Sequence, residues 1–208
     1  MKQYVAEGIG TFLLVFIGTL SASLSGGSIF LVALTFGVLL AILVLLIGPI
    51  SGAHVNPAVS LGAWLRGDLS SHDVLPFVLS QCIGAIGGSV LLFLLVGAGE
   101  PLGETMLPAE TLLTPVNAFL LEAFLTFVFV SAVLMMKGVS ERKAAAILGV
   151  LFFALHVIAI PLTGASFNPA RALAPVVVGA DPVAASLLWI FVAGPFLGGM
   201  VAGVVARR

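Results

Sequence analysis

The chain alternates between long apolar stretches and short polar connections. Six apolar stretches have about the twenty residues that an α-helix needs to cross the hydrocarbon core of a bilayer. They lie at residues 4–24, 29–49, 74–97, 114–136, 143–162 and 184–206. None of them alternates between apolar and polar residues as the strands of a membrane barrel do. Because backbone groups in lipid have to be hydrogen-bonded within their own segment, the pattern predicts six transmembrane α-helices.

The composition agrees with a membrane protein. Hydrophobic residues make up 61% of the 208 residues and charged residues 8%, whereas a soluble domain carries about 25% charged residues. So few charges argue against a soluble enzyme, and a formal net charge of −1 offers no basic surface to a nucleic acid. The single cysteine and three histidines show no metal-ligand spacing, and no nucleophile–base set is visible. We therefore expect no metal, no cofactor and no catalytic site.

The basic residues predict the orientation in the membrane. With six spans, the two termini and the connections at residues 50–73 and 137–142 share one side. Seven of the eight basic residues fall on this side: Lys2, Arg66, Lys137, Arg142, Lys143, Arg207 and Arg208. Under the positive-inside rule both termini are cytoplasmic, and the eighth basic residue, Arg171, lies toward the other side. Short loops and the lack of a transit peptide favour a multi-pass protein of a prokaryotic plasma membrane.

Two connections between spans repeat each other. Residues 49–58 read PISGAHVNPA and residues 161–170 read PLTGASFNPA, which are identical at six of ten positions. Glu7 and Glu122 open the first spans of the two halves in similar settings. The chain is therefore predicted to be a duplication within one integrated domain, with repeats at residues 1–105 and 106–208. Because each repeat has an odd number of spans, the two repeats face opposite ways in the membrane.

Each repeated segment predicts a short helix that begins inside the membrane. Asn is a favoured N-cap and Pro a favoured first helical residue, so helices are expected after Asn56 and Asn168, over residues 57–66 and 169–178. The glycines expected just past the two helix ends are Gly67 and Gly179. Two helices of about 15 Å that enter from opposite faces together span a core of roughly 30 Å. Their N-termini, the positive ends of the helix dipoles, are expected to meet near the centre.

The doubled Asn-Pro-Ala motif inside a six-span pattern resembles the aquaporin family of water and small-solute channels. The stretches that carry the resemblance are AEGIGT at residues 6–11, SGAHVNPA at 51–58 and NPAR at 168–171. The resemblance covers nearly the whole chain. It implies an all-α membrane protein with six transmembrane helices plus two re-entrant half-helices in an inverted repeat. It also implies a pore in every protomer and a homotetramer in the lipid bilayer.

Aquaporins narrow at an outer constriction built from four positions. The resemblance places Phe36, His156, Ala165 and Arg171 at this selectivity filter. Phe and His are similar to the water-selective branch, whereas glycerol-conducting members tend to carry Trp and Gly there. Ala165 departs from the pattern, because water channels more often have Thr or Cys at this position. Alanine widens the constriction slightly and offers no thiol to mercurials.

The two motifs are expected to form the pore centre. Their residues are Asn56, Pro57, Ala58, Asn168, Pro169 and Ala170. We expect the asparagine amides to donate to the oxygen of a passing water, whose hydrogens then point along the pore and interrupt proton transfer. The converging helix dipoles disfavour a cation at the same place. The alternative for the two asparagines is that they only cap their helices. The alternative for Arg171 is that it lies at a helix end and extends its charged group out of the membrane.

The resemblance implies a scaffold role for Glu7 and Glu122, which would accept hydrogen bonds from the loop backbone behind the half-helices. His54 borders the first motif, and both a cytoplasmic pore-lining role and a structural role are open for it.

These features predict a passive water channel that excludes protons and ions and has no enzymatic activity. One alternative is a broader channel for ammonia, hydrogen peroxide or glycerol, which Ala165 favours. Another is a secondary transporter, which also uses inverted repeats and broken helices. A transporter needs titratable residues at its central site, where this sequence has asparagine and apolar groups.

Overall fold

The computed structural model describes residues 1–207, and this part of the chain forms eight α-helices. The long helices are α1 (Lys2–Leu24), α2 (Ile29–Ser51), α4 (Ser71–Val96), α5 (Pro115–Met135), α6 (Glu141–Thr163) and α8 (Pro182–Val205). The short helices are α3 (Pro57–Arg66) and α7 (Pro169–Gly179). All six long helices are long and apolar enough to cross a membrane, which confirms the six predicted spans. Arg208, one of the residues used to predict orientation, lies outside the described residues.

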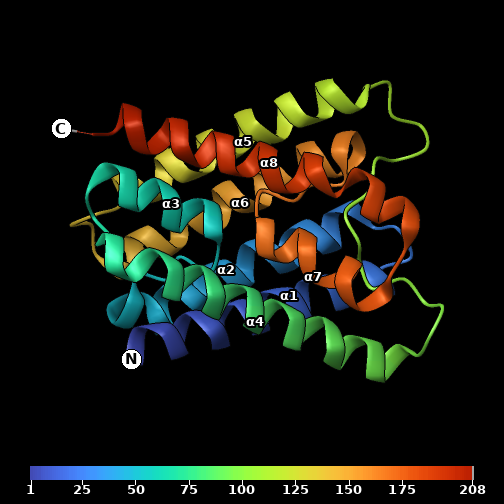
Figure 1. The fold of residues 1–208 in the computed structure, drawn as a ribbon, viewed down its shortest axis with the longest axis horizontal. Helices are drawn as coiled ribbons and strands as arrows, with labels where there is room; N and C mark the ends of the chain where they lie inside the picture. The colour runs from blue at the N-terminus through green and yellow to red at the C-terminus, as the bar shows by residue number, and fades with distance from the viewer. Residues whose placement is uncertain (208) are drawn as a thin grey trace.

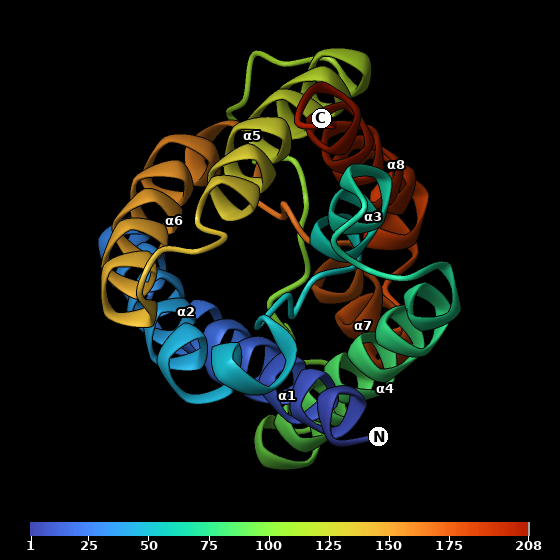
Figure 2. The same cartoon turned by 90° about the vertical axis from the view of Figure 1, so that its left-hand side faces the viewer.

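The long helices run side by side, and the two short helices lie between α4 and α8 at one side of the ring that the helices form (Figures 1 and 2). Extensive contacts join α1 with α4, α2 with α6, and α5 with α8. Both chain ends lie at one end of the molecule, which we call the termini end, and α3 lies toward it (Figure 1). The opposite end carries the connection at residues 97–114 and is called the loop end; α7 lies toward it. The two half-helices thus enter from opposite ends, and the predicted fold class is confirmed.

Small residues allow the long helices to cross at backbone distance. A Cβ atom added to Gly84 on α4 would lie 2.0 Å from the carbonyl oxygen of Gly8 on α1. In the other half, a Cβ on Gly198 of α8 would lie 2.2 Å from the carbonyl oxygen of Ala123 on α5. Only glycine fits such contacts, which are typical of packing between membrane helices. The same crossing therefore recurs in both halves of the chain.

The half-helices begin as the sequence predicts. Asn56 has an extended backbone, and its side-chain oxygen accepts a hydrogen bond from the Ala58 N–H at 2.9 Å. The side-chain oxygen of Asn168 accepts from the N–H groups of Ala170 at 3.0 Å and Arg171 at 3.3 Å. A proline follows each asparagine as the first helical residue. Helix α3 then ends at Gly67, whose φ of 94° is the left-handed conformation that glycine adopts without strain.

The expectation for Gly179 is wrong by one residue. Gly179 is the last residue of α7, and the left-handed C-cap is Ala180, with a φ of 55°. A Cβ on Gly179 would lie 2.8 Å from the Oε1 atom of Glu104 in the loop-end connection. The glycine is therefore needed for the close approach of this connection and not for the turn that ends the helix.

Candidate pore and constriction

The two asparagines join the half-helices where their N-termini meet. The Nδ2 atom of Asn56 donates to the carbonyl oxygen of Phe167 at 2.7 Å. In return, the Nδ2 atom of Asn168 donates to the carbonyl oxygen of Val55 at 2.8 Å. Both asparagines are at most 2% exposed, so these bonds lie inside the protein. Each side-chain amide thus caps its own helix with its oxygen and binds the opposite loop with its nitrogen.

The remaining motif residues form the buried first turns of the half-helices. Ala58 on α3 packs against α8, where a Cβ on Gly199 would lie 2.4 Å from the Ala58 carbonyl oxygen. Ala170 on α7 packs with Val15 on α1 and belongs to a small buried cluster. Pro57 and Pro169 are also buried. The motif therefore fixes where each half-helix starts and how closely it approaches the surrounding spans.

The loops that precede the half-helices have an unusual backbone. Four of their non-glycine residues have positive φ angles: Ala53 (49°), Val55 (42°), Ala165 (56°) and Phe167 (57°). Such residues cost about 1–3 kcal/mol each and persist only where their surroundings hold them. The two loops adopt the same conformation at equivalent positions, and both therefore need an external support.

Glu7 supports the first loop. It is fully buried, and its Oε1 atom accepts hydrogen bonds from the Ser51 hydroxyl at 2.6 Å and the His54 N–H at 2.9 Å. Its Oε2 atom accepts from the Val55 N–H at 2.6 Å and from Nε2 of Gln81 at 2.8 Å. Four donors thus converge on one carboxylate.

Glu122 takes the equivalent position in the second half. It is also fully buried, and its Oε1 atom accepts from the Thr163 hydroxyl at 2.6 Å and the Ser166 N–H at 3.2 Å. Its Oε2 atom accepts from the Phe167 N–H at 3.0 Å. Hydrogen bonds to a charged acceptor are the strong ones, so each carboxylate offsets part of the strain in its loop.

The structure brings together three of the four residues predicted for the constriction, namely Phe36, His156 and Arg171. The Phe36 ring stacks on the His156 ring with centroids 4.7 Å apart and an interplanar angle of 14°. The guanidinium carbon of Arg171 lies 5.5 Å from the centre of the Phe36 ring. Ala165 belongs to the same buried cluster as Phe36 and adds no polar side-chain atom. All four side chains are at most 4% exposed.

Two polar atoms of this group have no partner within residues 1–207, namely Nε2 of His156 and Nε of Arg171. The Nδ1 atom of His156 lies 2.8 Å from the carbonyl oxygen of Phe152. A carbonyl oxygen only accepts, so Nδ1 carries a hydrogen and Nε2 of the neutral ring is an acceptor. Among the fully buried atoms of this group, Nε2 of His156 is thus an unpaired acceptor and Nε of Arg171 an unpaired donor.

The groups that hold Arg171 were not predicted from the sequence. Its Nη1 atom donates to the carbonyl oxygen of Gly103 at 2.9 Å and to the hydroxyl of Thr105 at 2.5 Å. Thr105 is 2% exposed, because the loop-end connection folds back into the bundle. This connection joins the two repeats and has no counterpart within either of them, so the duplication gave no signal for it.

Gln81 on α4 was also missed, although a glutamine in an apolar span is a detectable signal. It is fully buried and donates through Nε2 to Glu7 and, at 2.9 Å, to the hydroxyl of Ser60. The Ser60 hydroxyl also lies 3.1 Å from Nδ1 of His54. His54 is therefore part of a polar chain that leads back to Glu7.

Cavities flank the meeting point of the half-helices. A cavity of about 600 Å³ opens at the termini end, and its lining includes His54, Phe77, Asp73 and Glu141. A second cavity, of about 490 Å³, opens at the loop end and reaches Arg171; its lining includes Ser28, Val32 and Gly103. His54 therefore lines a cavity and also bonds within the protein, and both of its predicted roles stay open.

Six spans around two half-helices that meet between two cavities are the architecture of an α-helical membrane channel. The family model for major intrinsic proteins matches residues 1–206. The chain therefore belongs to the major intrinsic protein family, the family of the aquaporin channels.

Its relatives carry names from two branches of this family. "Glycerol uptake facilitator protein-like 6" of Lactiplantibacillus plantarum is 33% identical, covering 100% of this chain and 97% of that protein. "Aquaporin Z" of Rhodopseudomonas palustris is 34% identical, covering 99% of this chain and 92% of that protein. "Aquaporin Z" of Bradyrhizobium diazoefficiens is 32% identical, covering 100% of this chain and 92% of that protein. The X-ray structure of the aquaglyceroporin from Plasmodium falciparum shares the fold, with a TM-score of 0.85 and 21% sequence identity. The match covers 97% of this chain and 93% of that chain.

Proposed function

We propose that this protein is a passive channel that conducts water down osmotic gradients and excludes protons and ions. The observation that carries the proposal is the constriction, where the stacked rings of Phe36 and His156 lie against Arg171. Bulky aromatic walls with few polar atoms favour a molecule as small as water. Two relatives named Aquaporin Z support the same reading.

At the pore centre, the asparagines act as donors to water. A primary amide has two N–H groups, and one of them binds the opposite loop in both Asn56 and Asn168. The second N–H of each amide is then free for the oxygen of a permeating water. A water that accepts from both amides points its hydrogens outward along the pore, so it cannot pass a proton to the next water. The meeting N-termini of α3 and α7 add positive potential there.

At the constriction, water replaces hydrogen bonds that the protein leaves unmade. A buried donor or acceptor without a partner costs about 1–3 kcal/mol. Water can donate to Nε2 of His156 and accept from Nε of Arg171, so both groups are satisfied while it passes. The positive charge of Arg171 repels cations at the same place. This arrangement lowers the cost of dehydration for water and raises it for ions.

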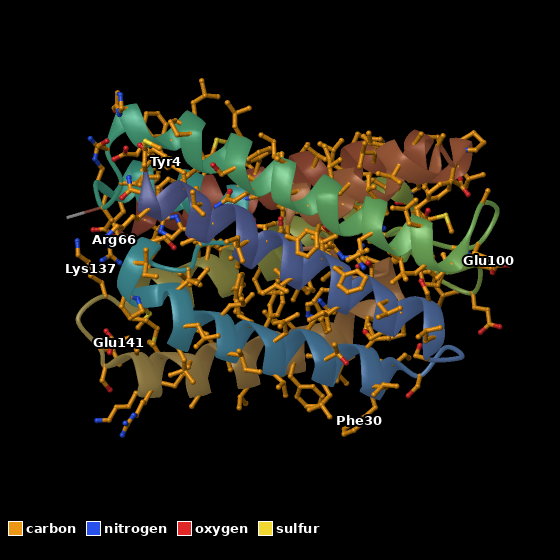
Figure 3. All side chains as sticks on the ribbon, turned by 90° about the horizontal axis from the view of Figure 1, so that it is seen from below. Tyr4, Phe30, Arg66, Glu100, Lys137 and Glu141 are labelled. Atoms are coloured by element: carbon orange, nitrogen blue, oxygen red, sulfur yellow. The ribbon has the colours of Figure 1, made fainter. Side chains whose placement is uncertain are left out.

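The proposal includes an orientation and an assembly. The labelled basic residues Arg66 and Lys137 lie at the termini end, and the acidic Glu100 lies at the loop end (Figure 3). By the positive-inside rule, the termini end faces the cytoplasm of a prokaryotic cell and the constriction faces outward. We propose a homotetramer in the plasma membrane, on the strength of the family resemblance.

A broader channel is the second candidate, and Ala165 is the observation that favours it. This residue is 1% exposed, and its small side chain occupies less volume than the threonine or cysteine that water channels more often carry there. A slightly wider constriction suits ammonia, hydrogen peroxide or glycerol. The relative named as a glycerol uptake facilitator supports this alternative. A secondary transporter fits less well, because both buried carboxylates, Glu7 and Glu122, are bonded to the loops behind the half-helices.

Stopped-flow light scattering on proteoliposomes tests the proposal. We expect fast osmotic shrinkage with a low activation energy, and glycerol entry far slower than water flow. Glycerol uptake at a comparable rate would instead support the broader channel. Uptake of solute driven by an ion gradient would overturn the channel itself, and protein-free liposomes give the baseline.

A further inference from the structure

One glycine on α1 lies directly against the aromatic wall of the constriction. A Cβ atom built on Gly18 would be 2.3 Å from Cε1 of Phe36 and 2.4 Å from its Cζ. Real Cβ atoms essentially never come this close to another heavy atom. The tip of the Phe36 ring therefore occupies the space that any side chain at residue 18 would need.

Other groups of the proposed constriction lie on the remaining sides of the ring. Phe36 is 1% exposed, one of its faces stacks on His156 at 4.7 Å, and Arg171 lies 5.5 Å from its centre. Phe152 also meets it edge-on, with ring centroids 6.2 Å apart. A push from α1 thus moves the ring toward the groups that form the constriction, because close-packed interiors transmit such displacements.

We propose that Gly18 is a specificity-determining residue: by having no side chain, it lets the Phe36 ring lie back against α1 and so sets the width of the constriction. The inference rests on the proposed function, because it treats Phe36 as part of the filter. To reach ordinary contact at 3.4 Å from an added Cβ, the ring tip has to move by about 1 Å. Water has a radius of about 1.4 Å, so this shift amounts to roughly a third of its diameter.

Gly18→Ala is the direct test, measured as osmotic water permeability per reconstituted protein. We expect a decrease of about tenfold, which corresponds to a rise of about 1.4 kcal/mol in the barrier to permeation. The same methyl group should have no effect where the ring is absent. In the Phe36→Leu background, which shortens the side chain, we therefore expect Gly18→Ala to leave the permeability unchanged. Dependence on residue 36 separates a filter effect from a general packing effect.

Gly149→Ala is the matched control. A Cβ at Gly149 on α6 would lie 2.8 Å from the Cβ of Ala41 on α2, the helix that carries Phe36. It would also lie 2.9 Å from the carbonyl oxygen of Gly37, so it disturbs the packing of α6 against the backbone of α2 without touching the ring. We expect Gly149→Ala to change the water permeability by the same factor in the wild-type background and in the Phe36→Leu background.

The outcomes are separable. If the wild-type protein conducts no water, the proposed function fails before Gly18 is tested. If the wild type conducts and Gly18→Ala lowers the permeability by the same factor in both backgrounds, or raises it, the inference about Gly18 is overturned alone. If the single variant does not assemble, the two proteins in the Phe36→Leu background are still comparable. A severalfold decrease caused by the methyl there would refute the inference.

Discussion

Replacing Thr105 by valine should loosen Arg171 without removing its charge. The two side chains have nearly the same shape, but valine cannot accept the hydrogen bond from Nη1 of Arg171. Thr105 is 2% exposed, so water does not readily replace the lost hydroxyl. Arg171 then keeps only the carbonyl oxygen of Gly103 as a partner for Nη1 in the described structure.

The expected magnitude follows from the type of bond. A hydrogen bond to a charged group contributes about 1.5–3 kcal/mol, which corresponds to about a tenfold to hundredfold change in the population of the held conformation. The guanidinium borders the loop-end cavity, into which it can then turn. Under the proposed function, a guanidinium that leaves Phe36 widens the constriction, so we expect glycerol permeability to rise severalfold relative to water permeability.

The assay is stopped-flow light scattering with water and glycerol on the same proteoliposome preparations. Thr105→Ser is the control, because serine keeps the hydroxyl and should keep the wild-type ratio of the two permeabilities. If the valine and serine variants both behave like the wild type, Thr105 does not position Arg171. If both variants change equally, the methyl group of Thr105 matters and not its hydroxyl, which refutes the reasoning as well.

Three further outcomes are expected. Arg171→Val should admit protons while the fold survives, seen as faster decay of a pH gradient across proteoliposomes; unchanged exclusion would remove Arg171 from the filter. Glu122→Gln should lower the free energy of unfolding in detergent by about 1.5–3 kcal/mol, because one oxygen becomes a donor facing the loop N–H groups. With Cys82 replaced by alanine, mercury(II) should not block water flow, and Ala165→Cys should create a block that a thiol reductant reverses; persistent flow through that variant would place residue 165 outside the constriction.

Much of the architecture could be predicted because the membrane restricts what a chain can do. The six spans follow from length and hydropathy, and the bounds of the observed helices lie within three residues of the expected ones. The starts of α3 and α7 could be predicted because Asn56 and Asn168 carry local capping chemistry that needs no tertiary information. The end of α7 could not be predicted, because the glycine at residue 179 is needed for the close approach of Glu104, which lies in a connection far away in the sequence.

The missed residues share one physical cause. Thr105 and Gln81 make their contacts with segments far away in the sequence, and neither belongs to the repeated motif. A local pattern reports which face of a helix is apolar, but it does not report which side chain meets another across the bundle. The resemblance named the constriction residues, whereas the groups that hold those residues in place became visible only with the fold.

The crossed asparagine bonds also bear on how the protein is made. The partner of Asn56 is the carbonyl of Phe167, 111 positions further along the chain, and Asn168 reaches back to Val55. While a ribosome is still synthesising the second half, the first re-entrant loop therefore has its amide unpaired inside the membrane. Such a loop is poorly suited to rest in lipid alone, so we expect α3 to settle into place only after α7 has emerged. Closure of the bundle around the two short helices is then a late event in biogenesis, and a truncated chain should be a substrate for membrane quality control.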